Sequence, residues 1–440
     1  MLGRKRSLTP AELSITFFIQ LFVIVAVARV VGWFCQRFLG QPQVVGEMIA
    51  GVLLGPSLLG LVLPDLSALL FPAQSKPILF VIAQLGIGLY MFLVGLGFDR
   101  DHFRSNLGSA GAISLSGVTA PFVMAMGLAP WLLSEGLFAP RISRAEATLF
   151  LGACMAITAF PMLARIIHER GISRSPLGTL SLSAGAIDDA CAWAVLAVVL
   201  ATLGAGAGVA IKAIGGALAF AAFMVLAGPR LFARFAPAVE ARGGVDNGLL
   251  GAVLMLFLLS AFAMDSAGMH AVFGGFLLGT AMPRGRFVRE IRAKLEPVTT
   301  VLLVPVFFTY SGLNTKLDVM SDPALFVIAV AILGASISAK FGACWAAARL
   351  TGQDNRTALG IGALMNARGL MELIIINIGL QQGLIGVELF SILALMAVVT
   401  TFMASPLFEL VYGRQARAAG QLGQLVDDAE PPTKVPATNR

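Results

Sequence analysis

The sequence is poor in charged residues. Asp, Glu, Lys and Arg make up 12% of its 440 residues, whereas apolar residues reach 58% and the mean hydropathy is +0.87. Soluble proteins carry about 25% charged residues, and a soluble fold of this length needs such groups to cover its surface. This shortage excludes a soluble enzyme, a nucleic-acid binder and a disordered chain, and it predicts a polytopic membrane protein.

Other common features are missing as well. The sequence lacks the alternating strands of a membrane barrel but has repeated apolar runs of about 18 or more residues, so we expect an all-α membrane protein. It has no Walker A motif, so a transporter of this kind runs on an ion gradient and not on ATP hydrolysis within this chain. The four cysteines form no CxxC pair, and we expect them to pack between helices. No resident cofactor is expected.

Thirteen apolar segments are long enough to cross a membrane. The first is too long for a signal peptide and has no cleavage site after it, so it is kept as a span. We expect a transmembrane domain over residues 1–411, followed by a disordered polar tail over 412–440. The expected spans are 13–34, 43–62, 77–98, 107–133, 145–168, 177–203, 208–228, 246–264, 266–283, 297–313, 324–349, 357–380 and 386–411.

The loops differ in positive charge. When the connections are assigned alternately to two sides, the side of the N-terminus carries eight Lys and Arg residues and the side of the C-terminus carries twenty. The densest cluster lies between Arg284 and Lys294, on the second side. Positive loops stay in the cytoplasm. We therefore expect a multi-pass protein of the cell (inner or plasma) membrane, with its N-terminus outside and its C-terminus in the cytoplasm.

Two of the segments are interrupted near their middle. One reads AITAFPMLARII and contains Thr158 and Pro161. The other reads ALMNARGLMELI and contains Asn366, Arg368 and Gly369. They are seven crossings apart and so run in opposite directions, as an inverted repeat requires. Broken helices at matching positions of two repeats predict a substrate site near the middle of the membrane.

Charges inside the membrane cost at least about 3 kcal/mol each, so each needs an explanation. The adjacent Asp188 and Asp189 are the strongest functional signal. Neighbouring helical residues point about 100° apart, so one carboxylate can face a cavity while the other faces the bundle. Two such carboxylates repel each other, and one of them gains by binding a proton or a cation. That competition is the minimal chemistry of an antiporter; a purely structural pair is the alternative.

The other charges are interpreted by position. Lys340 lies too deep in its segment to reach the surface, so we expect it to pair with Asp188 and leave Asp189 for the cavity. Arg368 and Glu372 are four residues apart and can form a pair within one helix. The functional alternative is that Arg368 holds the broken helix and adds positive potential to the carboxylate site.

The remaining charged and polar residues receive structural interpretations. Asp265 is expected to cap a helix near an interface. His270 is expected to be a packed polar residue, with a pH sensor as the alternative. Glu47 is placed near a membrane surface, and Arg29 is expected to extend its charge to the cytoplasmic surface.

Seven motifs occur in a fixed order along nearly all of the spans. They are QPQVVGEMIAGVLLGPSLLG, LGIGLYMFLVGLGFD, AITAFPMLARII, AGAIDDACAW, GMHAVFGGFLLG, VPVFFTYSGL and MNARGLMELI. In these motifs the chain resembles the monovalent cation:proton antiporter-2 family. The motifs GMHAVFGGFLLG and MNARGLMELI resemble most the plant cation/H⁺ exchanger branch and its bacterial relatives.

The resemblance implies an inverted-repeat sodium/proton antiporter fold with two crossed broken helices. It also implies a homodimer in which a core moves against a dimerisation scaffold. The core helices are then expected at about 107–203 and 324–411, and the scaffold helices in the remainder.

The resemblance also implies roles for individual residues. Asp189 is the group that binds the proton or the transported cation, and Asp188 pairs with Lys340. Thr158 lies beside the site, and Arg368 corresponds to a characteristic arginine of the second broken helix.

The expected function is antiport of Na⁺ or K⁺ against H⁺. The Asp-Asp pair indicates Na⁺ and net charge movement, whereas the flanking motifs indicate K⁺. Export of an organic cation on the same scaffold is an alternative, and a passive cation channel is another. An intramembrane aspartyl protease is disfavoured, because it needs its two aspartates on different helices.

Overall fold

The computed structural model describes residues 9–39, 43–98, 107–173, 175–200, 207–268, 271–313, 322–368 and 370–413. Within these ranges the chain is built from helices, and the only β pairing is a single antiparallel bridge between Phe138 and Ile385. The all-α prediction is therefore confirmed. Nearly all of the expected tail, residues 414–440, lies outside the described residues.

The helices follow the apolar segments of the sequence. In chain order they are α1 (Pro10–Leu39), α2 (Gln43–Leu54), α3 (Leu59–Val62), α4 (Pro64–Leu70), α5 (Lys76–Gly97), α7 (Leu107–Ser134), α8 (Arg144–Ala156), α9 (Phe160–Glu169), α10 (Pro176–Leu200), α11 (Ala207–Leu226), α12 (Gly228–Phe232), α13 (Phe235–Ala241), α14 (Asn247–Ser266), α15 (Ala271–Ala281), α16 (Arg286–Val298), the π-helical turn η2 (Thr299–Leu303), α17 (Val304–Gly312), α18 (Pro323–Leu350), α19 (Asn355–Leu364), α20 (Leu370–Gln381), α21 (Val387–Phe408) and the π-helical turn η4 (Glu409–Gly413).

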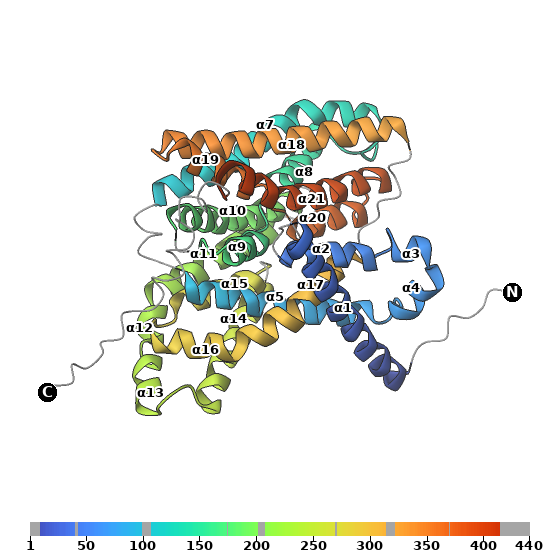
Figure 1. Cartoon of the computed structure of the whole chain (residues 1–440). Helices are drawn as coiled ribbons and strands as arrows, with labels where there is room; N and C mark the ends of the chain where they lie inside the picture. Colours follow the sequence, from blue (N-terminus) through green and yellow to red (C-terminus); the bar gives the residue numbers. More distant parts are fainter. Residues whose placement is uncertain are drawn as a thin grey trace.

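Two groups of helices pack mainly among themselves. Helices α7, α8, α9 and α10 pack with α18, α19, α20 and α21, and we call this group the core bundle. Its long helices α7 and α18 lie side by side along one face of the molecule (Figure 1). Because α7–α10 and α18–α21 are far apart in sequence, this bundle joins the two halves of the chain.

The second group consists of α1, α2, α5, α14, α15 and α17, which we call the scaffold bundle. Its most extensive helix contact is that of α5 with α15. A Cβ atom added at Gly95 would overlap the carbonyl of Phe276, and one added at Gly279 would overlap the carbonyl of Phe92. Small residues let helix backbones approach this closely in a membrane protein.

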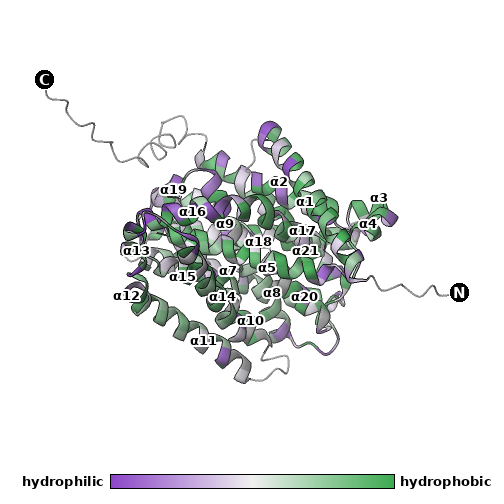
Figure 2. Cartoon of the chain, turned by 90° about the horizontal axis from the view of Figure 1, so that it is seen from below, coloured by the Kyte–Doolittle hydropathy of each residue, from purple (hydrophilic) through white to green (hydrophobic). Residues whose placement is uncertain are grey.

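Apolar side chains cover much of the outer surface. Phe18, Phe22 and Trp33 of α1 are 68%, 68% and 59% exposed, and apolar colour dominates the long helices in Figure 2. Polar colour gathers near α13 and α16 (Figure 2), where the basic cluster between Arg284 and Lys294 lies. A surface of this kind suits the hydrocarbon region of a bilayer.

The structure does not fix the number of membrane spans. Among the described residues, seven helices are long and apolar enough to cross a membrane, and a bent pair, Ile211–Leu226 with Gly228–Ala241, raises the number to eight. Each of the thirteen expected spans overlaps a helix, but several overlap helices that are broken or short. The count of thirteen therefore stays a prediction.

Candidate functional site

The first interrupted segment is a broken helix. Helix α8 begins with a capping box formed by Ser143 and Glu146 and ends at Ala156. A break of three residues follows, and Ile157 and Ala159 at its two ends have extended backbone. Helix α9 then begins with a proline, Pro161, in its first turn. Proline is well tolerated there because the first N–H groups of a helix have no partner within it.

The second interrupted segment is broken in the same way. Helix α19 ends at Leu364, and α20 begins at Leu370. Asn366 and Arg368 lie in the break and are fully buried. Gly369, the third residue of the predicted interruption, lies outside the described residues.

The two breaks cross and are hydrogen-bonded to each other. The backbone N–H of Ala159 donates to the carbonyl of Ala367 at 2.9 Å. The hydroxyl of Thr158 donates to the carbonyl of Met365, also at 2.9 Å. Four free helix ends therefore meet at one place inside the core bundle.

Asp188, on α10, is well compensated beside this crossing. Its Oδ2 atom accepts hydrogen bonds from the backbone N–H of Thr158 at 2.9 Å and from Nζ of Lys340 at 2.8 Å. Its Oδ1 atom lies 3.5 Å from the hydroxyl of Ser114, which donates to it. Asp188 and Lys340 are both fully buried. The pair expected between them is present in the structure.

Asp189, the next residue, has no such partners. It is 1% exposed, and neither of its carboxylate oxygens has a hydrogen-bond donor among the described residues. An isolated charged carboxylate in such a place is strongly unfavourable. A proton or a bound cation would remove this cost, which sets Asp189 apart from Asp188.

Two cations cover the carboxyl end of α8. Lys340 donates to the carbonyl of Ala156. Arg368 donates to the carbonyls of Cys154 and Met155 at 2.7 and 2.6 Å. The last carbonyls of a helix have no partner within it and carry its negative dipole end. Both cations therefore stabilise the end of α8 that points at the crossing.

Arg368 also pairs with Glu372, with 3.3 Å between Nη1 and Oε1. The intrahelical interpretation assumed a continuous helix between these two residues. The structure differs, because α20 begins two residues after Arg368. The backbone N–H of Arg368 donates to the hydroxyl of Thr401 at 3.0 Å, and its guanidinium donates to the hydroxyl of Ser336.

Three hydroxyl groups at the site were not identified from the sequence. They belong to Ser114, Ser336 and Thr401. For Ser336 a signal existed, because it precedes Lys340 by four residues and shares a face of α18 with it. The other two lie in long apolar helices with no sequence feature that distinguishes them from packing residues.

The outlying polar residues are placed as follows. Glu47 lies one turn into α2 and is fully buried, 3.9 Å from Arg165. Arg29 is half-buried in α1. Asp265 is exposed in the last turn of α14, so the expectation that it caps the start of a helix is wrong. His270 lies outside the described residues.

Sequence comparisons give relatives of this chain. It is 36% identical over 395 residues to the Na⁺/H⁺ antiporter NhaS4 of Synechocystis, covering 89% of this chain and 96% of that protein. It is 33% identical to cation/H⁺ antiporter 17 of Arabidopsis thaliana and 30% identical to K⁺/H⁺ antiporter 1 of Saccharomyces cerevisiae. These matches cover 90% and 84% of this chain but only 48% and 44% of the two eukaryotic proteins.

The fold has a solved counterpart. The sodium proton antiporter MjNhaP1 of Methanocaldococcus jannaschii aligns with a TM-score of 0.61 at 14% identity, over 94% of this chain and 98% of that one. Residues 22–411 match the family model described as the transmembrane sodium/hydrogen exchanger. The chain therefore belongs to the sodium/hydrogen exchanger family.

Proposed function

We propose that the protein exchanges a monovalent cation, Na⁺ or K⁺, for protons, and that Asp189 binds the two in turn. The family is one of transporters, not enzymes, and its relatives include Na⁺/H⁺ and K⁺/H⁺ antiporters. The observation that carries the proposal is the contrast between two adjacent buried carboxylates. Asp188 has three donors, and Asp189 has none among the described residues.

In the proposed cycle the charge of Asp188 stays neutralised by Lys340 while the occupant of Asp189 changes. Asp189 releases its proton on one side of the membrane and takes up a cation there. The core bundle then moves against the scaffold bundle and carries the cation across. Protonation of Asp189 releases the cation on the other side. Competition for one carboxylate couples the two fluxes without any covalent chemistry.

The test is Asp189→Asn in proteoliposomes, with a pH-sensitive dye inside and a cation pulse outside. Asn cannot be ionised, so we expect cation-dependent dequenching to disappear while the protein still elutes as a folded species. Asp265→Asn is the matched control, because Asp265 is exposed and outside the site. Exchange that continues unchanged in Asp189→Asn would reject the proposal.

The transported cation is decided by the same assay. Pulses of Na⁺, K⁺ and Li⁺ in turn rank the substrates. A voltage clamp with valinomycin then tells whether net charge moves, as the Asp-Asp pair suggests. A pulse of an organic cation tests the alternative substrate class.

We further propose a homodimer joined through the scaffold bundle, in the cell membrane, with the N-terminus outside and the C-terminus in the cytoplasm. The loop charges support this orientation. Exposed apolar residues on α1 and α14, such as Phe18 and Phe262, give the scaffold bundle a surface that can pack against a second copy. Reporter fusions at the two termini test the orientation, and chemical cross-linking in native membranes tests the dimer.

A further inference from the structure

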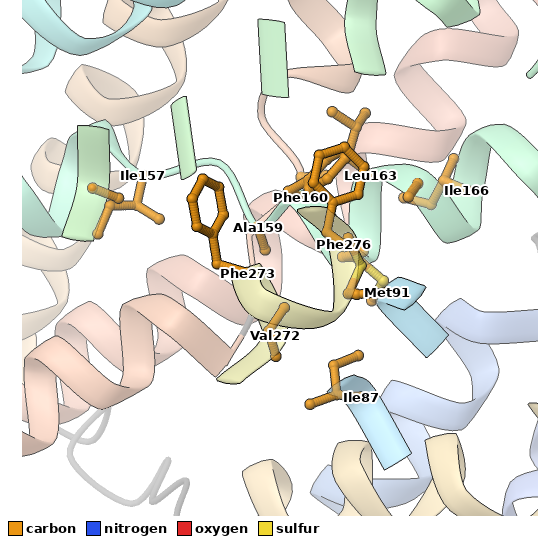
Figure 3. Packing of buried hydrophobic residues seen from close by; sticks show 14 of the residues in the cluster. Ile87, Met91, Ile157, Ala159, Phe160, Leu163, Ile166, Val272, Phe273 and Phe276 are labelled. Atoms are coloured by element: carbon orange, nitrogen blue, oxygen red, sulfur yellow. The ribbon is translucent and has the colours of Figure 1, made fainter. Parts of the chain in front are cut away.

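The second half of the first broken helix has two different ends. Near the break, Phe160 packs edge-on against Phe276 of α15, with ring centres 4.9 Å apart. Figure 3 shows this apolar contact, with Leu163 of α9 and Met91 of α5 close by. Toward its other end α9 carries Arg165, His168 and Glu169. These positions follow the i, i+3, i+4 spacing and so lie on one face of the helix.

Each of these three polar residues contacts a helix outside the core bundle. Glu169 accepts a hydrogen bond at 3.2 Å from the backbone N–H of Val44, in the first turn of α2. The guanidinium of Arg165 lies 3.9 Å from the carboxylate of Glu47 on α2 and 5.9 Å from the ring centre of Tyr90 on α5.

The third contact joins α9 to α16. Nε2 of His168 lies 3.4 Å from a carboxylate oxygen of Glu296. Within α9, Arg165 also pairs with Glu169 at 2.5 Å. One short helix of the core bundle is thus attached to three helices outside that bundle, α2, α5 and α16.

Burial makes these contacts specific to one arrangement of the bundles. Glu47 is fully buried, and its Oε2 atom has no hydrogen-bond partner among the described residues. Arg165 is only 7% exposed. Buried charges are tolerated only while their partners are in place. A shift of a few ångströms between α9 and α2 would separate these groups, so the cluster favours the position seen here.

The opposite side of the molecule is different. Helix α20, which corresponds to α9 in the second repeat, borders a cavity of about 300 Å³ between the two bundles. Core residues such as Leu380 and Phe390 line one wall, and Pro56, Lys76 and Leu313 line the other. Polar contacts therefore join the bundles at the α9 side, whereas at the α20 side, where α20 contacts α17, the bundles border a cavity.

We propose that Arg165, His168 and Glu169 of α9 form a lock with their partners on α2, α5 and α16. The lock holds the core bundle against these helices and must open in each transport cycle. The inference rests on the proposed function, because only a moving core needs to break these contacts. In the state seen here the lock closes the α9 side, while the cavity borders the α20 side.

The test follows opening directly and needs no transported cation. Val44 is fully buried and lies one turn before Glu47, on the same face of α2. In a Val44→Cys chain the backbone N–H that binds Glu169 is kept. The rate at which a membrane-impermeant maleimide labels this cysteine reports the separation of α9 from α2. The chain without Val44→Cys gives the background from the four native cysteines.

We expect Glu169→Gln in the Val44→Cys chain to raise the labelling rate about tenfold, that is, by about 1.4 kcal/mol, because the neutral amide weakens the charge-assisted hydrogen bond to the backbone N–H at position 44. Glu409→Gln is the matched control. Glu409 also pairs with a residue that follows α9, Arg170, but both belong to the core side. Glu409→Gln should therefore leave the labelling rate unchanged. Equal labelling of Glu169→Gln and Glu409→Gln would overturn the proposal.

A second measurement tests whether the lock must open during transport. In the purified variant His168→Cys, Glu296→Cys, the two introduced thiols are joined by a reducible bifunctional reagent. We expect exchange to stop on cross-linking and to return on reduction. Exchange that continues in the cross-linked protein would show that these contacts stay closed throughout the cycle, and so reject the lock. The labelling rates stand whatever Asp189→Asn shows, so the two proposals fail separately.

Discussion

The two broken helices have the same backbone plan but differ in how their ends are compensated. At the end of α8 the last carbonyls receive hydrogen bonds from Lys340 and Arg368. At the end of α19 the corresponding groups are neutral: the side-chain amide of Asn366 donates to Gly362, and Thr158 donates to Met365. The two repeats therefore share the backbone geometry of the break, but among the described residues the positively charged donors lie only at the end of α8.

The difference extends to the second half of each broken helix. Helix α9 ends in polar residues that contact α2, α5 and α16, whereas α20 borders a cavity. Two halves that are related by symmetry in backbone thus occupy different environments in one state. In an alternating-access protein such a difference marks which side is closed, and the opposite state should exchange these environments.

The largest effect is expected from removing a charge at the end of α8. Lys340→Ala leaves the buried Asp188 without its cation and exposes the Ala156 carbonyl. Removing one partner of a buried ion pair costs about 3–5 kcal/mol. Asn366→Ala removes a neutral hydrogen bond from the other break and should cost about 1 kcal/mol. Equilibrium unfolding of both variants in detergent measures the difference.

The double variant Asp188→Asn, Lys340→Met is the control for this prediction. Removing both charges together leaves no unpaired ion, so most of the stability lost in Lys340→Ala should return. If Lys340→Ala and Asn366→Ala lose equal stability, the two breaks are not compensated differently.

A smaller effect is expected from the hydroxyl that joins the breaks. Thr158→Val keeps the shape of the side chain and the backbone N–H that binds Asp188, but it leaves the buried carbonyl of Met365 without this donor. The expected loss is about 1–3 kcal/mol. Thr119→Val is the control, because Thr119 is exposed and donates only within α7, to Leu115. Equal unfolding free energies for the two variants would contradict a joining role for Thr158.

The smallest effect concerns the start of α19. Asp354 caps this helix by accepting from the backbone N–H groups of Arg356 and Thr357 at 2.9 and 3.2 Å. The hydrogen bond from the Thr357 side chain, followed by these backbone bonds, lowers the pKa of Asp354 from its ordinary value. Since the folded pKa is lowered, the stabilisation is complete above the ordinary pKa and is lost as pH falls through the folded one.

Amide hydrogen exchange in the first turn of α19 measures this cap. Asp354→Ala should increase exchange at neutral pH by about 1 kcal/mol of opening free energy, and the difference from the unchanged chain should vanish in acid. Asp354→Asn still caps but does not titrate, so its difference from Asp354→Ala should not depend on pH. A constant difference between Asp354 and Asp354→Ala would contradict the assignment.

The sequence predicted what composition and intramembrane charge control. The helical class, the interruption of two segments and the proximity of Asp188 to Lys340 all follow from the cost of charge and broken helices in a bilayer. The position of Asp265 was predicted wrongly, because a residue between two apolar runs can end a helix as well as begin one. The contacts of Ser114, Thr401 and Glu169 depend on which helices meet, and one sequence does not contain that information.

The hydrogen bond between Ala159 and Ala367 joins the two repeats through main-chain atoms alone. Its strength is independent of side-chain identity, apart from proline at position 159, which would remove the donor. Side chains around the crossing can therefore change in the course of evolution, and ion preference with them. The main-chain hydrogen bond between the repeats persists. A family whose repeats are joined by main-chain atoms can diversify its substrates without a change of fold.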